Sequence, residues 1–364
     1  MIPDHDTAAA RYDAAILVQF ASQLLQRTGL AEPRAATVAE ILVEGDLLGH
    51  TTHGLQLLAP YLAELASGGM RAAGEPETVS DRGAVVTWDG KRLPGPWLVV
   101  RAFELAAARA RAHGTGTVVI RRSHHIACLA AYLKRVTDQG LVALLLSSDP
   151  TVRSVAPFGG TAPLYTPNPI AAGIPTDGDP LLIDISSSTT TNGLTGRLRA
   201  AGATLDHDWL LDHAGAPSRD PEVLFTDPPG SILPLGGVEL GHKGFGLAIL
   251  IEALTAALGG FGRADPAEGW GASVFAQVID PAAFGGLAAF QRETGWLARA
   301  VRENPPRPGG PAVRMPGDGA LRRRAAQLRD GVALHPAILP ALEPWARKCD
   351  TTLPPPRERP QRIS

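Results

Sequence analysis

The chain has 364 residues, of which 45% are hydrophobic and 19% charged, a composition typical of globular proteins. Its formal net charge of −2 at pH 7 provides no basic surface for nucleic acid. The length exceeds that of one typical domain and predicts two or three lobes. The two cysteines, Cys128 and Cys349, indicate neither a disulfide framework nor a cysteine-based zinc site.

Helical spacing dominates residues 1–75, which we expect to form a helical N-terminal lobe. Two apolar sets recur at that spacing: Val38, Ile41, Leu42 and Leu48, then Leu55, Leu58, Leu62 and Leu65. Gly49 is placed to end the first helix, and Gly68 the second. Thr52 and His53 therefore lie at a helix–helix junction, where side chains can face a cleft.

From about residue 84 the pattern changes to alternating strands and helices. We expect strands at 85–88, 117–120 and 141–146, and helices at 98–113 and 126–139. Gly114 closes the first of these helices. His125 then lies in a strand-to-helix loop, a position that often carries chemistry in such units.

An apolar strand at 181–185 carries Asp184 and runs into six hydroxyl residues, 186–191. Two interpretations of Asp184 stay open. It caps a helix or turn, or its carboxylate orients a histidine or binds a ribose or amide group of a cofactor.

The motif Gly241-His242-Lys243-Gly244-Phe245-Gly246 precedes the most apolar segment, 245–258. We expect the motif to open a helix whose first backbone N–H groups, beside Lys243, suit a phosphate. The segment is short for a membrane span and carries Glu252, so we expect a buried helix rather than a membrane segment.

The C-terminal part is rich in proline, glycine and arginine. Helices are expected at 320–330 and 337–348, and a disordered tail at 353–364. Arg322–Arg324 is interpreted as a solvated face or, alternatively, a phosphate contact. The N-terminus lacks a basic start followed by an apolar run, so a cytoplasmic location is expected.

Two histidine segments carry most of the chemical information: Gly49-His50-Thr51-Thr52-His53-Gly54 and Ser123-His124-His125. Histidine exchanges protons near neutral pH, so both segments indicate a proton-transfer site. A metal-dependent hydrolase using these histidines is an alternative, but no acidic residue stands at zincin spacing. The dinucleotide fingerprint GxGxxG is missing, and so is the GxSxG elbow of triad hydrolases.

The chain resembles the type-2 malate/L-lactate dehydrogenase family over roughly residues 10 to 345. This family includes ureidoglycolate, sulfolactate and 2,3-diketogulonate dehydrogenases and Δ1-piperideine-2-carboxylate reductases. Besides the two histidine segments, five motifs in the right order carry the resemblance: Ser148-Asp149-Pro150, Ala156-Pro157-Phe158-Gly159-Gly160, Asn168-Pro169-Ile170, Asp184-Ile185-Ser186-Ser187-Ser188 and Gly241-His242-Lys243-Gly244-Phe245-Gly246-Leu247.

The resemblance implies an α+β protein with a non-Rossmann nicotinamide-binding fold. A mainly antiparallel sheet, the helical N-terminal lobe and a third lobe would form the subunit. Cofactor and substrate lobes would occupy 76–150 and 151–310, and the helices within 320–348 can pack on the N-terminal lobe. A homodimer is expected, with a small 2-oxo or cyclic imino acid as substrate and neither nucleic acid nor membrane as partner.

Site residues follow from the resemblance motif by motif. The implied catalytic residues are His53, His125 and Asp184. The implied cofactor contacts, to NADP or NAD with NADPH slightly favoured, are Ser148, Asp184, Ile185, Ser186, His242, Lys243, Pro316, Gly317 and Asp318. The implied substrate contacts are Thr52, His53, Leu57 and Asn168, and no metal is implied. A relative that binds a nucleotide or small acid without catalysis stays an alternative.

Departures from the family pattern concern the substrate. Leu57 stands where many members have an arginine that holds the substrate carboxylate, and His124 replaces an asparagine. Thr52 replaces a serine and keeps its hydroxyl, and Thr166-Pro167 departs from the usual Gly-Thr before Asn168. Without the bidentate guanidinium, the sequence predicts a weaker hold on small 2-oxo acids than on larger or cyclic substrates.

Overall fold

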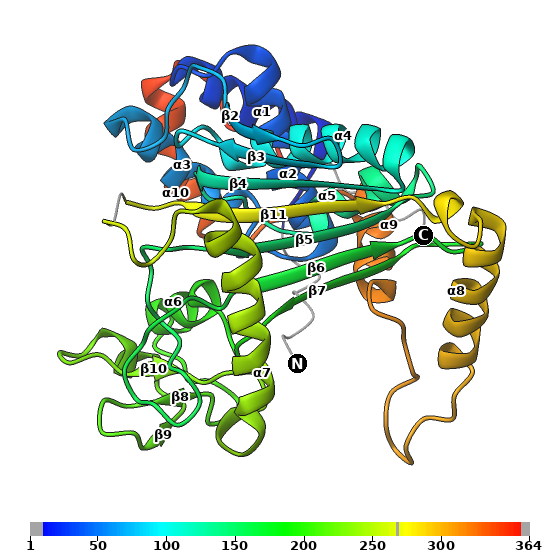
Figure 1. Cartoon of the computed structure of the whole chain (residues 1–364). Coiled ribbons are helices and arrows are strands. Elements are labelled where there is room, and N and C mark those ends of the chain that lie inside the picture. Colours follow the sequence, from blue (N-terminus) through cyan, green and yellow to red (C-terminus); the bar gives the residue numbers. More distant parts are fainter. Residues whose placement is uncertain (1–9, 267–268, 358–364) are drawn as a thin grey trace, which may run out of the picture. The chain divides into compact units, whose positions relative to one another are not determined.

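The computed structural model describes residues 10–266 and 269–357 (Figure 1). The chain divides into two compact units. One combines residues 1–74 with 301–364, and the other spans residues 75–300. The first and last parts of the chain therefore fold together, while the middle forms a unit of its own.

The first unit is mainly helical. Its elements are α1 (Ala14–Arg27), α2 (Glu32–Leu48), the 3-10 turn η1 (Leu55–Leu57), α3 (Leu58–Ser67), α9 (Asp318–Asp330), α10 (Ile338–Lys348), and the paired strands β1 (Arg11–Tyr12) and β12 (Val332–Ala333). As predicted, α2 ends at Gly49 and α3 at Gly68, both in the left-handed conformation with φ of 91° and 81°. All residues of the two predicted apolar sets are buried. The turn between α2 and α3, at residues 50–53, is partly exposed.

A seven-stranded sheet organises the second unit, in the order β2-β3-β4-β11-β5-β6-β7. The strands are β2 (Glu77–Asp81), β3 (Val85–Asp89), β4 (Thr115–Ser123), β5 (Val142–Ser148), β6 (Pro169–Ile174), β7 (Leu181–Ser186) and β11 (Ala272–Ile279). Every pairing is antiparallel except β3 with β4, so the expected mainly antiparallel sheet is confirmed. The expected lobe boundary near residue 150 falls inside this sheet. Strand β5, which precedes residue 150, pairs with β6 and β11, which follow it.

Helices pack on this sheet. They are α4 (Gly95–His113) and α5 (Ala130–Thr137), with α7 (Gly237–Glu252) crossing in front of the strands in Figure 1 and continuing as the π-helical η3 (Ala253–Ala257). The prediction that a helix begins at residue 126 is wrong, because α5 begins at Ala130. The reason lies at Ala127, whose left-handed φ of 60° is incompatible with a right-handed helix.

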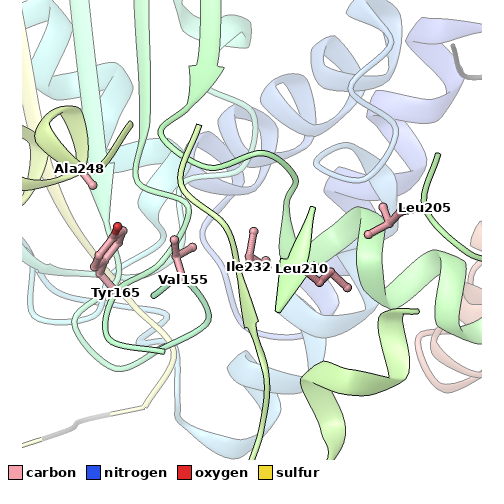
Figure 2. Close-up of a cluster of buried hydrophobic side chains, with 6 residues drawn as sticks. All are labelled: Val155, Tyr165, Leu205, Leu210, Ile232 and Ala248. Atoms are coloured by element: carbon pink, nitrogen blue, oxygen red, sulfur yellow. The ribbon is translucent and has the colours of Figure 1, made fainter. Parts of the chain in front are cut away.

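A smaller sheet, β10-β8-β9, lies beside α7. Its strands are β8 (Leu210–Leu211), β9 (Pro217–Ser218) and β10 (Ser231–Ile232), and α6 (Asn192–Ala200) and η2 (Pro221–Phe225) accompany them. Figure 2 shows the apolar cluster that joins these strands to α7: Val155, Tyr165, Leu205, Leu210, Ile232 and Ala248. This cluster anchors the chain that leads into β6.

The helix α7 differs from the sequence prediction in two ways. It begins at Gly237, not in the motif 241–246, so that motif lies inside the helix. It is also not fully buried, because Ile249 and Leu250 are about half exposed. Residues Gly237–Ala257 are long and apolar enough to cross a membrane, with 33% of the most apolar window buried, but a single such helix is weak evidence of a span.

The C-terminal part contains elements that the sequence reading missed, namely η4 (Pro281–Ala283) and α8 (Leu287–Arg302). The tail expected to be disordered lies partly outside the described residues, from 358 onward. Arg357 itself is placed, because its backbone N–H donates to Arg11 O and its Nη1 to Arg329 O at 2.8 Å. The expectation of disorder is therefore wrong for 353–357.

Candidate active site

The His53 segment is a tight turn that follows α2. The backbone N–H of His53 donates to His50 O at 2.8 Å, and that of His50 donates to Gly45 O at 2.8 Å. The Thr52 hydroxyl lies 2.9 Å from Nδ1 of His53, which holds the imidazole ring from one side. The ring is half-buried, so it is both oriented and accessible.

Asp46, which the sequence reading missed, shapes this turn. Its side chain is fully buried, and Oδ2 accepts a hydrogen bond from the backbone N–H of Leu55 at 2.7 Å. A Cβ on Gly54 would overlap the same carboxylate, so glycine is needed there. An aspartate in the last turn of an apolar helix was the signal for this role.

Leu57 is the last residue of η1 and is half-buried. Its backbone N–H donates to Gly54 O at 3.0 Å, which continues the turn that Asp46 holds. An apolar side chain thus lies at the position where the family resemblance predicts an arginine that binds the substrate carboxylate.

His125 lies in the loop between β4 and α5, as predicted. Its Nδ1 accepts a hydrogen bond from the backbone N–H of Ala127 at 3.3 Å. The ring stacks on Trp270, with centroids 4.7 Å apart and planes inclined by 30°. These contacts hold the ring over the face of the indole, and the left-handed conformation of Ala127 turns its N–H back toward the ring.

His124 is chemically different from its neighbour. Its side chain is completely buried and meets Trp270 edge-on, with centroids 5.1 Å apart. Burial, and next the positive charge of Arg92, lower the pKa of His124 to about 3. A pKa this low leaves the ring neutral at pH 7.

Asp184 lies in β7 and holds the start of α5. Its Oδ2 accepts a hydrogen bond from the backbone N–H of Ala130 at 2.9 Å, and the thiol of Cys128 lies 3.8 Å away. Burial, and next the Asp184 charge, raise the pKa of the Cys128 thiol, which stays protonated. The interpretation of Asp184 as a local cap is not met, because Thr191 caps the helix that follows β7; Asp184 instead contacts the first N–H of α5 and secures the segment that follows His125.

Three of the expected site residues meet at one edge of the large sheet. Ser148 ends β5 and Ser186 ends β7, while Asn168 immediately precedes the intervening strand β6. Because β6 is antiparallel to both neighbours, the ends of β5 and β7 and the start of β6 coincide. Ser148 is buried, with its hydroxyl 2.9 Å from that of Thr255 in η3.

A buried polar network supports Asn168, and its other members were not predicted. Asn168 is fully buried in a left-handed conformation, and its Nδ2 donates to Glu252 Oε1 at 3.0 Å. Arg263 donates to the same oxygen through Nε and Nη2 at 3.0 and 2.8 Å, and its Nη1 donates to Val152 O at 2.9 Å. The network ties α7 to the edge where Ser148 and Ser186 end.

His242 and Lys243 are exposed on α7, in its second turn. The expectation that backbone N–H groups beside Lys243 open the helix is wrong, because those groups are inside it. Only the exposed side chains of His242 and Lys243, and not their backbone N–H groups, are available to contact an anion here. The following residue, Gly244, brings α7 against the sheet edge, because a Cβ there would overlap the backbone of Leu235 and Ser187.

The loop 316–318 leads into α9 of the first unit. The Asp318 carboxylate accepts hydrogen bonds from Nε and Nη2 of Arg302 at 3.0 and 2.7 Å, and from the Met315 N–H at 3.0 Å. The Arg302 hydrogen bond is the largest cause that holds the pKa of Asp318 below its usual value. Through these hydrogen bonds, the Asp318 carboxylate holds the conformation of this loop.

Comparison with known proteins identifies the family. The model of the malate/L-lactate dehydrogenase family matches residues 12–343. The chain belongs to the malate/L-lactate dehydrogenase family. It is an NAD(P)-dependent oxidoreductase, which decides against the hydrolase alternative.

Three relatives illustrate the range of the family. An L-lactate dehydrogenase from Cupriavidus necator is 31% identical over 346 residues, covering 92% of this chain and 97% of the relative. A (2R)-3-sulfolactate dehydrogenase (NADP(+)) from Chromohalobacter salexigens is 35% identical over 237 residues, covering 65% and 68%. The crystal structure of Δ1-piperideine-2-carboxylate reductase from Pseudomonas syringae matches with a TM-score of 0.80 and 27% identity, covering 92% of this chain and 99% of that one.

Proposed function

We propose that this dehydrogenase reduces the carbonyl group of a 2-oxo acid, or the C=N bond of a cyclic 2-imino acid, and catalyses the reverse oxidation. The family match over residues 12–343 carries this proposal. The relatives named for lactate, sulfolactate and piperideine-2-carboxylate support it, because each compound bears a carboxylate on the reacting carbon.

His125 is proposed as a proton-transfer residue. The backbone N–H of Ala127, 3.3 Å from Nδ1, orients the ring. In the reduction, the ring protonated on both nitrogens donates its Nε2 proton to the oxygen or nitrogen that gains electron density, which leaves a neutral ring; in the oxidation, Nε2 of the neutral ring accepts the proton. The stacked face of Trp270 stabilises the ring when it is charged.

His53 is proposed as the second proton-transfer candidate. When Nδ1–H donates to the Thr52 hydroxyl, Nε2 of the neutral ring can accept a proton, and the ring protonated on both nitrogens can return it. We propose Nε2 as the proton-transfer atom of both histidines. Asp184 contributes by holding the start of α5 behind His125.

The cofactor is proposed to lie along the sheet edge and α7. The residues fit a phosphate-bearing dinucleotide, because exposed Lys243 offers a cation, Ser148 and Ser186 offer hydroxyls, and exposed Ile185 offers an apolar surface. Asp184 and His242 complete the set proposed for this unit, and the family resemblance adds the loop Pro316–Asp318 as an expected cofactor contact. When bound, the nicotinamide supplies the hydride for reduction, and the protein contributes orientation and the proton. This is a nicotinamide site without GxGxxG, and we favour NADPH over NADH.

Fluorescence titration with NADH and NADPH, followed by cofactor oxidation with a panel of 2-oxo and cyclic imino acids, tests this function. We expect saturable binding and turnover of at least one acid in the panel. Absence of binding by both cofactors would refute the cofactor assignment. Binding without turnover of any acid would favour a non-catalytic relative. A homodimer in the cytoplasm also belongs to the proposal.

A further inference from the structure

Arg323 of α9 lies against the residue where the His53 segment begins. Its Nη1 donates to Leu48 O, the last carbonyl of α2, at 3.1 Å. A Cβ on Gly49 would overlap the same guanidinium, so a glycine is required for this close approach. The guanidinium therefore lies beside Gly49, which precedes His53 by four residues in the same unit.

The neighbouring polar side chains of α9 contact α2. Arg324 pairs with Glu44 at 2.6 Å, and Gln327 donates to Asp46 O and Leu47 O at 2.8 and 3.0 Å. These contacts dock α9 on α2 in addition to the hydrogen bond from Arg323 to Leu48 O. Among residues 10–266 and 269–357, Arg323 has no carboxylate partner, and its side chain is exposed.

We infer that Arg323 binds the carboxylate of the acid substrate, an inference that rests on the proposed function. A guanidinium has five N–H donors in a planar fork that matches a carboxylate, and the hydrogen bond to Leu48 uses one of them. Leu57, at the other end of the same turn, supplies no charge. Arg323 thus provides the carboxylate contact that the sequence near His53 lacks, and small 2-oxo acids keep a strong anchor.

Arg323→Gln is the sharpest variant, because glutamine keeps an N–H donor for Leu48 O and removes the charge. We expect kcat/KM for the best 2-oxo acid to fall at least tenfold, mainly through KM, since charge-assisted hydrogen bonds are lost. The preference for the acid over its uncharged methyl ester should shrink by a similar factor. A merely structural role would leave that preference unchanged. NAD(P)H affinity should stay the same.

Arg329→Gln is the matched control, because Arg329 is an exposed arginine on the same helix whose side chain pairs with its neighbour Asp330. It should leave kcat/KM and the acid preference unchanged. Leu57→Arg in the Arg323→Gln background should restore acid binding at least in part. Unchanged acid preference in Arg323→Gln would overturn the inference, as would an equal loss in Arg329→Gln.

Calorimetry with oxamate, an unreactive mimic of a 2-oxo acid, separates this inference from the proposed function. We expect wild-type protein with NADPH to bind oxamate at least tenfold more tightly than Arg323→Gln does. If oxamate binding depends on Arg323 while no acid is turned over, the carboxylate site stands and the proposed reaction fails. If acids are turned over and oxamate binds both proteins equally, the reaction stands and the carboxylate site fails.

Discussion

Two adjacent histidines in this chain have opposite chemical properties. His125 is half-buried with its ring stacked on Trp270, whereas His124 is fully buried and held neutral by burial and Arg92. The buried ring of His124 packs edge-on against Trp270. Only His125 of this pair is therefore suited to proton exchange at neutral pH.

Replacing either His53 or His125 by alanine should lower turnover by about two orders of magnitude or more, the usual effect of losing a general acid–base group. The affinity for NAD(P)H should change much less. Steady-state kinetics together with fluorescence titration measure both quantities. His124→Asn is the control and should keep turnover within a few-fold. If both alanine variants turn over like wild type, the acid–base assignment fails.

His124 should also make the folded state acid-sensitive. Its pKa is about 3 in the folded protein and about 6.5 in the unfolded chain, so only the unfolded chain takes up this proton between those values. The free energy of unfolding should therefore fall as pH decreases below about 6.5, by up to ~1.4 kcal/mol per pH unit. Urea unfolding at pH 7, 6 and 5 measures the slope. His124→Asn should have a shallower slope, and parallel profiles would contradict this cause.

At the scale of elements, one of the glycines in α7 determines how closely this helix packs on its neighbours. Gly244 lets the helix backbone touch Leu235 and Ser187, whereas a Cβ at Gly246 would meet no atom within 4 Å. The first glycine is thus a packing requirement, and the second weakens the helix without a steric reason. Through Gly244 and the Asn168–Glu252 bond, α7 carries Lys243 to the sheet edge.

Gly244→Ala should destabilise the protein by about 1–3 kcal/mol or more, because the added methyl group overlaps backbone atoms that have no alternative position. Gly246→Ala, two residues further along the same helix, should stabilise it by up to about 1 kcal/mol through helix propensity. Urea unfolding of both variants without cofactor measures the difference. Equal effects at the two positions would show that the close approach is not decisive.

At the scale of the molecule, α7 presents an exposed apolar surface. Val238, Leu240, Ile249 and Leu250 are each about half exposed, and Leu258 follows η3 in the same state. An exposed apolar surface of this kind is typical of an interface. The expected homodimer would bury it.

Light scattering at micromolar concentration should therefore give twice the 38.1 kDa mass of the chain. Leu250→Glu should shift the protein toward the monomer, because a carboxylate is costly to bury in an apolar contact. Val79→Glu is the control, since Val79 is similarly exposed but lies in the edge strand β2. A monomeric wild type, or a dimer that Leu250→Glu leaves intact, would exclude this surface as the interface.

The sequence by itself determined several local elements and the family. Helical spacing with Gly49 and Gly68 placed α2 and α3, apolar runs placed β4, β5 and β7, and seven ordered motifs indicated a dehydrogenase, because these signals lie within short windows of the chain. Only the tertiary structure decided that β11 inserts between β4 and β5, that Asp184 contacts the first N–H of α5, and that Arg323 reaches Gly49. Those contacts join residues that are 54 to 274 positions apart, and packing, not local propensity, selects them.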